Sequence, residues 1–335
     1  MKKRILKALL FKKPIHLILH VTNICNLRCK TCFVDFERAG NDKLSLEEIR
    51  EVAVDVGKLI WLDISGGEPF LRNDIADICS NFDAESIAIP TNGHIPQLIF
   101  DQTKIIRSKT RANLRIDVSI DGFEKTNDDI RGSSSFKNAI DTVRLLKSIK
   151  GIRIKINTVL CNRNYDEIID FMRFIRDLDV DFHSIIFRRG AQEVDIPYDR
   201  PSYEKLLKLK KDVFEIWRAY DYGVGKFERK VLQNYQKIMY ETSLRIIKEK
   251  RQIPDCLAGT FHLVIGYNGD VAFCEMLPPF GNIRYKKLKE LLSLKEADRQ
   301  RKSIRAKRCY CHHNCNLMDS ILLNPFFYPK LLSGI

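Results

Sequence analysis

The sequence predicts an α/β protein built as a partial (β/α)6 TIM-like barrel with an added C-terminal extension. Two observations support this fold class: six short apolar runs are typical of buried strands, and helical patterns of about 10 to 15 residues separate them. The runs cover residues 15–21, 60–64, 86–89, 114–120, 152–160 and 182–187. This alternation indicates βαβ units with right-handed crossovers and a parallel sheet. Six such units suit an incomplete barrel.

The elements between and after these runs have their own signals. Ser45 and Glu48 form a capping box that opens a helix ending near residue 58. After residue 200 the alternation of strands and helices stops, and two long charged helical stretches follow, at residues 203–220 and 226–250. A hairpin follows, because Asn268-Gly269 between two strand-like runs is a strong two-residue turn signal.

A short helix over residues 288–294 then precedes the last cysteines. We therefore divide the chain into a core, a helical connection and a C-terminal domain. These cover residues 15–200, 201–250 and 251–335.

Composition and charge narrow the class of protein. The chain has 335 residues, of which 44% are hydrophobic and 30% charged, as in ordinary folded proteins. Lys and Arg exceed Asp and Glu by 14, which favours an anionic partner, but no nucleic-acid-binding motif is present and nucleic acid is the less favoured partner.

The sequence also bears on location. No apolar run reaches the roughly 20 residues that cross a bilayer, and no secretory signal is present, so we expect a cytoplasmic protein. The basic amphipathic residues 1–14 and the Leu- and Phe-rich residues 321–332 either contact an anionic membrane surface or form helices that pack on the barrel.

Ten cysteines in a reducing compartment favour metal ligation over disulfides. Eight of them fall into two groups separated along the chain, and Cys79 and Cys161 stand alone, as small residues of the core. The two groups are Cys25, Cys29 and Cys32, and Cys256, Cys274, Cys309, Cys311 and Cys315.

The first group has the spacing C-x3-C-x2-C directly after the first predicted strand. Three thiolates on a short loop can ligate three irons of a 4Fe–4S cluster and leave the fourth iron open for a ligand. A zinc knuckle that lacks its fourth ligand and a cluster of buried thiols are the alternatives.

This spacing resembles that of the radical S-adenosylmethionine (radical SAM) superfamily, and further motifs follow in the order of that family. Gly66-Gly67-Glu68-Pro69 resembles the motif that holds the methionine amino group, and Arg131 resembles an arginine that pairs with the cofactor carboxylate. The resemblance implies polar cofactor contacts at Thr91, Asn92, Ser119, Asp121 and Asn157. One departure is Thr31, where the family often has an aromatic residue, although Phe33 lies close by.

The C-terminal domain resembles the auxiliary-cluster extensions called SPASM and twitch. Cys256, then glycine, four residues and Cys274, then the late cysteine group follow their pattern. The five cysteines imply one auxiliary 4Fe–4S cluster, with one cysteine to spare. A structural zinc site is the alternative. His312 and His313 could substitute for cysteines as ligands, but we expect them to be exposed loop residues.

The resemblance also implies an activity. S-adenosylmethionine would bind the open iron, accept one electron from a reductant such as flavodoxin or ferredoxin, and give methionine and a 5′-deoxyadenosyl radical. That radical would abstract hydrogen from a peptide or from a small metabolite, such as a sugar or a lipid-linked molecule. The other functions left open are tRNA or other nucleic-acid modification, and electron transfer without turnover.

Overall fold

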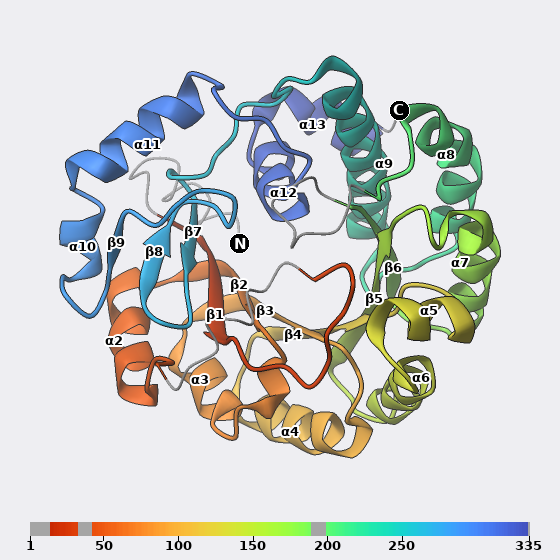
Figure 1. The fold of residues 1–335 in the computed structure, drawn as a ribbon, viewed down its shortest axis with the longest axis horizontal. Helices are drawn as coiled ribbons and strands as arrows, with labels where there is room; N and C mark the ends of the chain where they lie inside the picture. The colour runs from red at the N-terminus through yellow and green to blue at the C-terminus, as the bar shows by residue number, and fades with distance from the viewer. Residues whose placement is uncertain (1–13, 33–41, 189–198, 334–335) are drawn as a thin grey trace.

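A parallel sheet of six strands forms the core of the fold, as the sequence predicts. The computed structural model describes residues 14–32, 42–188 and 199–333. Neighbouring strands pair in chain order from β1 to β6, and the arc that they form is not closed (Figure 1). The strands are β1 (His16–Thr22), β2 (Leu59–Gly66), β3 (Ala84–Thr91), β4 (Asn113–Ser119), β5 (Ile152–Leu160) and β6 (Phe182–Phe187).

Helices cover the outer side of this arc (Figure 1). Most of them turn an apolar stripe inward; in α7, Ile168, Phe171, Met172 and Ile175 recur at helical spacing and are buried. The exception is α5, whose buried residues are Asn127, Ile130 and Arg131. Ser45 and Glu48 form the predicted capping box at the start of α2. The outer helices are α2 (Leu46–Val56), α3 (Ile75–Asn81), α4 (Pro96–Lys109), α5 (Glu124–Arg131), α6 (Ser135–Leu146), α7 (Ile168–Asp177) and α8 (Tyr203–Arg218).

The C-terminal hairpin continues the sheet of the barrel. β7 (His262–Ile265) pairs in parallel with β1, and β8 (Asp270–Ala272) returns antiparallel to it after the predicted turn, where Gly269 has a φ of +91°. β9 (Gly281–Asn282) completes a nine-stranded sheet, and α10 (Leu288–Leu291) and α11 (Lys295–Arg305) follow it. The barrel and the extension therefore share one hydrogen-bonded sheet.

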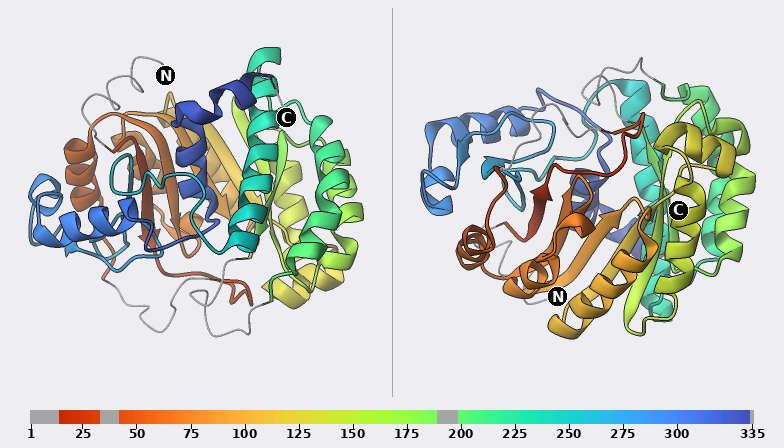
Figure 2. Two further views of the ribbon diagram at one scale, coloured as in Figure 1. Left: turned by 90° about the horizontal axis from the view of Figure 1, so that it is seen from above. Right: turned by 60° about the horizontal axis from the view of Figure 1, so that its bottom comes forward.

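The last helices pack against the long helix α9 (Lys226–Glu249). α12 (Asn314–Leu322) lies between β7 and α9 on the open side of the arc, and α13 (Tyr328–Ser333) follows it (Figures 1 and 2). Buried side chains from these helices form one apolar cluster, made by Tyr235, Ile238, Met239, Ile246, Leu317, Ile321, Phe327 and Leu331. This agrees with the packing interpretation of residues 321–332. Residues 1–13 lie outside the described part of the chain, and none of its helices is long and apolar enough to cross a membrane.

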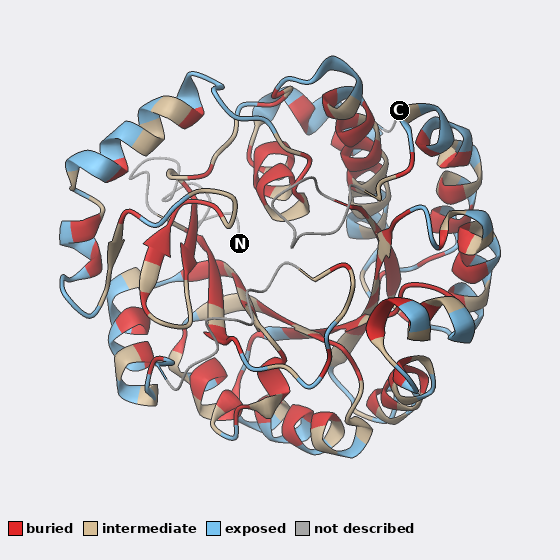
Figure 3. Ribbon diagram, in the orientation of Figure 1, coloured by how far each residue is buried: buried red, intermediate tan, exposed pale blue. Residues whose placement is uncertain are grey.

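Burial follows the strands and the sheet-facing sides of the helices, whereas α11 is exposed along most of its length (Figure 3). Some of the side chains in and around the core are charged. Asp117 on β4 lies 2.6 Å from Arg115 Nε and 3.1 Å from Lys155 Nζ on β5. Asp117 thus offsets part of the positive charge that Arg115 and Lys155 bring to β4 and β5.

Candidate active site and auxiliary cysteine site

The first cysteine group lies at the carboxyl edge of the sheet, in the loop that follows β1. Cys25, Cys29 and Cys32 are half-buried, and their sulfurs are close enough to affect one another electrostatically. Burial raises the pKa of the Cys29 thiol to about 11; the nearby guanidinium of Arg131 lowers it, and the other two thiols raise it. The structure thus brings together the three thiols that the spacing predicts.

Gly66 and Gly67 let the end of β2 run directly against the chain that leads into Cys25. The amide of Gly67 donates to Thr22 O at 2.7 Å, and that of Glu68 donates to Ile24 O at 2.9 Å. A Cβ on Gly67 would lie 2.2 Å from Ile24 O, and one on Gly66 would lie 2.1 Å from Thr22 O. The glycines are therefore required by the approach of two backbone segments, and this approach sets the position of the cysteine loop.

Glu68 links β2 to the end of β3. Its side chain is 1% exposed, and its carboxylate accepts hydrogen bonds from the Thr91 hydroxyl at 2.9 Å and the Asn92 amide at 2.7 Å. It also accepts the amide of Phe70 at 3.3 Å, in the short 3-10 helix that begins at buried Pro69. Burial raises the pKa of Glu68 to about 7, although the hydrogen bonds from Asn92, Thr91 and Phe70 lower it.

Asn92 carries this network on to the first cysteine. Its side-chain Nδ2 lies 3.6 Å from Cys25 Sγ and donates to Asn26 Oδ1 at 2.8 Å. The sulfur of Cys25 also accepts the amide of Leu27 at 3.4 Å. Since N–H···S contacts are among the means by which a protein tunes an iron–sulfur cluster, Asn92 is placed to act on the cysteine site through Cys25.

Arg131, at the end of α5, approaches the cysteines from the other side. Its Nη1 lies 3.9 Å from Cys29 Sγ, and its Nε lies 2.8 Å from Asp121 Oδ2. Asp121 is fully buried and also accepts the amide of Val159 at 2.8 Å. Asp121 therefore holds the guanidinium of Arg131 beside the cysteines. Both oxygens of the Asp121 carboxylate contact protein groups.

Ser119 and Asn157 are paired neighbours at the carboxyl ends of β4 and β5. Asn157 Oδ1 is buried and accepts no hydrogen bond from the described residues. An oxygen of this kind is an available acceptor for a polar ligand. Together with Thr91 and Asn92, the structure gathers all the predicted contact residues along one edge of the sheet.

The second cysteine group collects around the hairpin. Burial raises the pKa of the Cys256 thiol to about 12, and the thiols of Cys311, Cys274 and Cys309 raise it further because they lie nearby. Cys315 has different surroundings: its sulfur lies within 4.8 Å of ligand atoms of Glu275 and His313. The late cysteine group is therefore divided between two environments.

The expectation that His312 and His313 are exposed is wrong. Both are buried, because the chain here turns inward toward α12. His313 Nε2 lies 2.7 Å from Glu275, which also lies 3.1 Å from His20 Nε2 on β1. Burial raises the pKa of Glu275, but the two imidazoles more than offset this and lower it well below the usual range. No local pattern in the sequence indicates this triad, because its members are far apart along the chain.

The two remaining cysteines are core residues, as predicted. Cys79 in α3 and Cys161 after β5 are fully buried, and Cys79 packs in the main hydrophobic core.

The donor sets fit iron–sulfur clusters. Thiolates are the ligands that such clusters take, and each group offers at least three of them on short loops. The cationic Arg131 and the N–H groups that reach Cys25 favour negative charge at the first site.

Comparison with protein families gives two matches that divide the chain. Residues 19–175 match the Radical SAM superfamily, and residues 256–316 match an iron-sulfur cluster-binding domain, SPASM. The two matched segments contain the two cysteine groups.

Several curated proteins are similar to this chain. The Bacillus subtilis protein AlbA, named for biosynthesis of the antilisterial bacteriocin subtilosin, is 25% identical over 82% of this chain and 58% of its own length. Pre-heme d1 synthase of Dinoroseobacter shibae is 32% identical over 50% of this chain and 42% of its own length. GTP 3′,8-cyclase of Limosilactobacillus fermentum is 29% identical over 50% of this chain and 52% of its own length. The chain thus spans about half the length of these relatives.

Solved structures share the fold. Streptococcus suis SuiB bound to S-adenosylmethionine has a TM-score of 0.64 at 17% identity, with 85% of this chain and 66% of SuiB covered. The protein anSMEcpe with bound AdoMet has a TM-score of 0.61 at 16% identity, with 85% of this chain and 83% of anSMEcpe covered. A further structure shows SuiB bound to the precursor peptide SuiA.

Proposed function

We propose that this chain, which belongs to the radical SAM superfamily and carries a C-terminal iron–sulfur cluster-binding domain, cleaves S-adenosylmethionine reductively to begin a reaction on a peptide. The observation that carries the proposal is the placement of Cys25, Cys29 and Cys32 at the carboxyl edge of a parallel sheet, where barrel enzymes build their active sites. The bound cluster and S-adenosylmethionine supply electron transfer and a carbon radical.

The side chains around the cysteines would bind and orient these groups. Cys25, Cys29 and Cys32 would ligate the cluster, and Arg131, held by Asp121, would supply a fork for a carboxylate. Glu68 retains one acceptor position after its three hydrogen bonds, which suits the methionine ammonium. Gly66, Gly67 and Pro69 would fix the position of Glu68, and Thr91, Asn92, Ser119 and Asn157 would line the same edge of the sheet.

For the auxiliary 4Fe–4S cluster we assign Cys256, Cys274, Cys309 and Cys311 as ligands. The thiols of Cys311, Cys274 and Cys309 raise the pKa of Cys256, and the thiol of Cys311 raises the pKa of Cys274, which supports this choice. Cys315 would be the spare cysteine, since its sulfur lies beside Glu275 and His313.

A peptide is the substrate class that the similarities favour. The relative that spans both domains of this chain, AlbA, is named for bacteriocin biosynthesis, whereas the two relatives that are named for small-molecule synthesis match only about half of it. SuiB, which shares the fold, has been solved with a precursor peptide. A flavodoxin or ferredoxin would serve as the reductant.

The test is anaerobic turnover of the reconstituted protein. With dithionite and S-adenosylmethionine, the wild type should form 5′-deoxyadenosine, and Cys29→Ala should abolish it because two thiolates cannot hold the cluster in a competent form. Cys79→Ala is the matched control, since it removes a buried core thiol and should leave both clusters and the activity in place. Wild-type protein that holds about eight irons and makes no 5′-deoxyadenosine would refute the proposal.

Peptide specificity needs a separate assay. Candidate short peptides encoded beside the gene should raise 5′-deoxyadenosine formation and become modified, as seen by mass spectrometry. Stimulation by RNA, and by no such peptide, would contradict the peptide assignment.

A further inference from the structure

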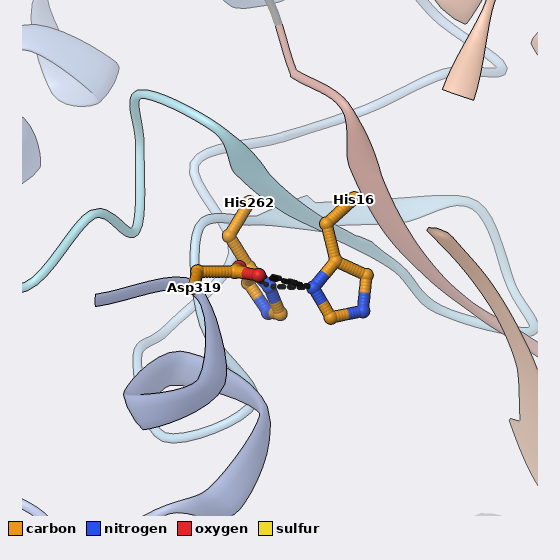
Figure 4. A group of neighbouring side chains, drawn as sticks. All are labelled: His16, His262 and Asp319. Atoms are coloured by element: carbon orange, nitrogen blue, oxygen red, sulfur yellow. Dashed lines mark hydrogen bonds and ion pairs between the residues drawn. The ribbon is translucent and has the colours of Figure 1, made fainter. Parts of the chain in front are cut away.

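Three buried side chains from distant parts of the chain meet on the inner side of the sheet, and one of them, Asp319, lies one helical turn after Cys315 in α12. His16 opens β1, His262 opens β7 and Asp319 lies in α12 (Figure 4). All three are fully buried. They converge because β7 pairs with β1 in register, which aligns His16 with His262, and α12 lies beside these strands.

Their ligand atoms form a nearly equilateral triangle. His16 Nδ1 and His262 Nδ1 each lie 3.0 Å from Asp319 Oδ2, and the two nitrogens lie 3.2 Å apart. Four ligands at about 2.0 to 2.1 Å around a tetrahedral ion are separated by about 3.3 Å, so the triangle has the size of one face of such a site. The imidazole planes cross at 89°, so the two rings meet edge to face and do not stack.

A fourth residue fixes the tautomer of His16. Its Nε2 lies 3.1 Å from Asp63 Oδ2 on β2, and since a carboxylate only accepts, this nitrogen carries the proton. His16 Nδ1 faces both oxygens of Asp319, each 3.0 Å away, and the Nδ1 of His262 at 3.2 Å. Burial lowers the pKa of His16, but Asp319 and Asp63 together raise it to about 10, so a cation, either a proton or a metal ion in its place, belongs between these atoms. A carboxylate on the outer nitrogen of a histidine is also the usual support of a metal ligand.

We propose that His16, His262 and Asp319 form a binding site for a divalent transition-metal ion, of which Zn²⁺ is the natural occupant. Two imidazole nitrogens with carboxylate oxygen are typical zinc ligands, whereas Mg²⁺ and Ca²⁺ take oxygen only. The second oxygen of Asp319 also lies 3.0 Å from His16 Nδ1, so this carboxylate can bind the ion through both of its oxygens.

The surrounding charges agree with a dication. Asp319 and Asp63 each bring one negative charge to the site. The other carboxylate nearby, Asp117, is already paired with Arg115 and Lys155. Arg115 and Lys155 together carry one positive charge more than Asp117 offsets, and both also act on Asp63. Asp319, which has no lysine or arginine salt bridge among the described residues, is therefore the carboxylate whose charge a divalent ion would offset.

The ion has a structural role, because it would tie α12 to both β1 and β7. α12 begins at Asn314 and contains Cys315, and its Asn316 donates from Nδ2 to Cys274 Sγ at 2.9 Å. Fixing α12 on the sheet therefore fixes one wall of the auxiliary cysteine site. Zinc at this position couples the barrel to the extension without taking part in the reaction.

The test measures zinc in the cluster-loaded protein. After anaerobic reconstitution and passage over a chelating resin, we expect about one zinc per chain by elemental analysis. Zinc K-edge absorption should show nitrogen and oxygen neighbours and no sulfur, because sulfur neighbours would place the zinc at the cysteines instead. Adding Zn²⁺ to the metal-depleted site should raise the melting temperature.

Three variants distinguish zinc binding by these side chains from a role of the same side chains in folding without a metal. Asp319→Asn keeps the shape of the side chain and should lower zinc affinity at least a hundredfold, and Asp63→Asn should lower it about 10- to 100-fold. Asp117→Asn is the matched control, since it removes a buried carboxylate whose partners are Arg115 and Lys155, and it should keep the zinc.

The outcomes are distinct. Wild type without zinc, with no thermal shift on adding Zn²⁺, overturns the proposal, as does zinc bound only through sulfur. Equal zinc affinity in Asp319→Asn and wild type also overturns it. Because iron content and 5′-deoxyadenosine formation are measured on the same samples, a failure of the proposed activity is seen separately from a failure of this site.

Discussion

Gly67→Ala tests how the end of β2 positions the cysteine loop. The new Cβ would lie 2.2 Å from Ile24 O and 2.6 Å from Ile24 C, and contacts below 3.0 Å are essentially never seen. The neighbouring atoms are backbone, so they cannot turn aside as a flexible side chain does. The segment before Cys25 would have to retreat by about 0.8 Å.

The cost follows from the hydrogen bonds that join the two segments. A retreat breaks or lengthens the bonds from Gly67 N to Thr22 O and from Glu68 N to Ile24 O. Each bond that leaves a buried group without a partner costs about 1 to 3 kcal/mol, so the loss of both bonds should cost roughly 2 to 6 kcal/mol locally. A displacement near 1 Å at a catalytic centre can by itself cost about a hundredfold in rate.

The assay compares iron content, S-adenosylmethionine affinity and 5′-deoxyadenosine formation. We expect Gly67→Ala to lose about four of about eight irons, or to bind S-adenosylmethionine at least tenfold more weakly, while the auxiliary cluster stays intact. Gly225→Ala is the matched control, because nothing lies within 4 Å of a Cβ at Gly225. If Gly67→Ala keeps all its iron and cleaves S-adenosylmethionine at the wild-type rate, the steric argument is wrong.

Two further predictions concern titration and the auxiliary ligands. Because the pKa of Glu68 is raised to about 7, its carboxylate gains a proton as the pH falls from 8 to 6 and accepts fewer hydrogen bonds. S-adenosylmethionine affinity should therefore fall about tenfold over this range in the wild type and stay flat, and low, in Glu68→Gln; equal pH profiles by equilibrium dialysis would contradict this. Cys309→Ala should lose the auxiliary cluster while Cys315→Ala keeps it, as iron analysis and Mössbauer spectra would show, and the reverse result would exclude our ligand assignment.

The barrel was predictable because its signals are local. An apolar run marks a strand, and a capping box at Ser45 marks a helix start, within a few residues of each feature. The ends of strands were less accurate: the third run was expected at residues 86–89, whereas β3 covers Ala84–Thr91. Ladder hydrogen bonds extend a strand beyond its buried centre, and the apolar pattern records only that centre.

The first cysteine site was also predictable, because its three thiols lie within one loop and Glu68 and Asn92 follow strands that end at the same edge. Sequence alone did not say what the motif residues touch. Gly66 and Gly67 are needed because backbone atoms of Thr22 and Ile24 lie too close for a Cβ, and only the folded chain brings these segments together.

The sequence by itself determined the fold class, the order of the motifs and the cysteines available for clusters, since periodicity and short spacings encode all three. The tertiary structure alone decided that β7 joins β1, that His313 is buried against Glu275, and that His16 meets Asp319. The His16–Asp319 contact joins residues 303 positions apart. Contacts of this kind depend on strand register and helix packing, and no local pattern of residue types specifies either.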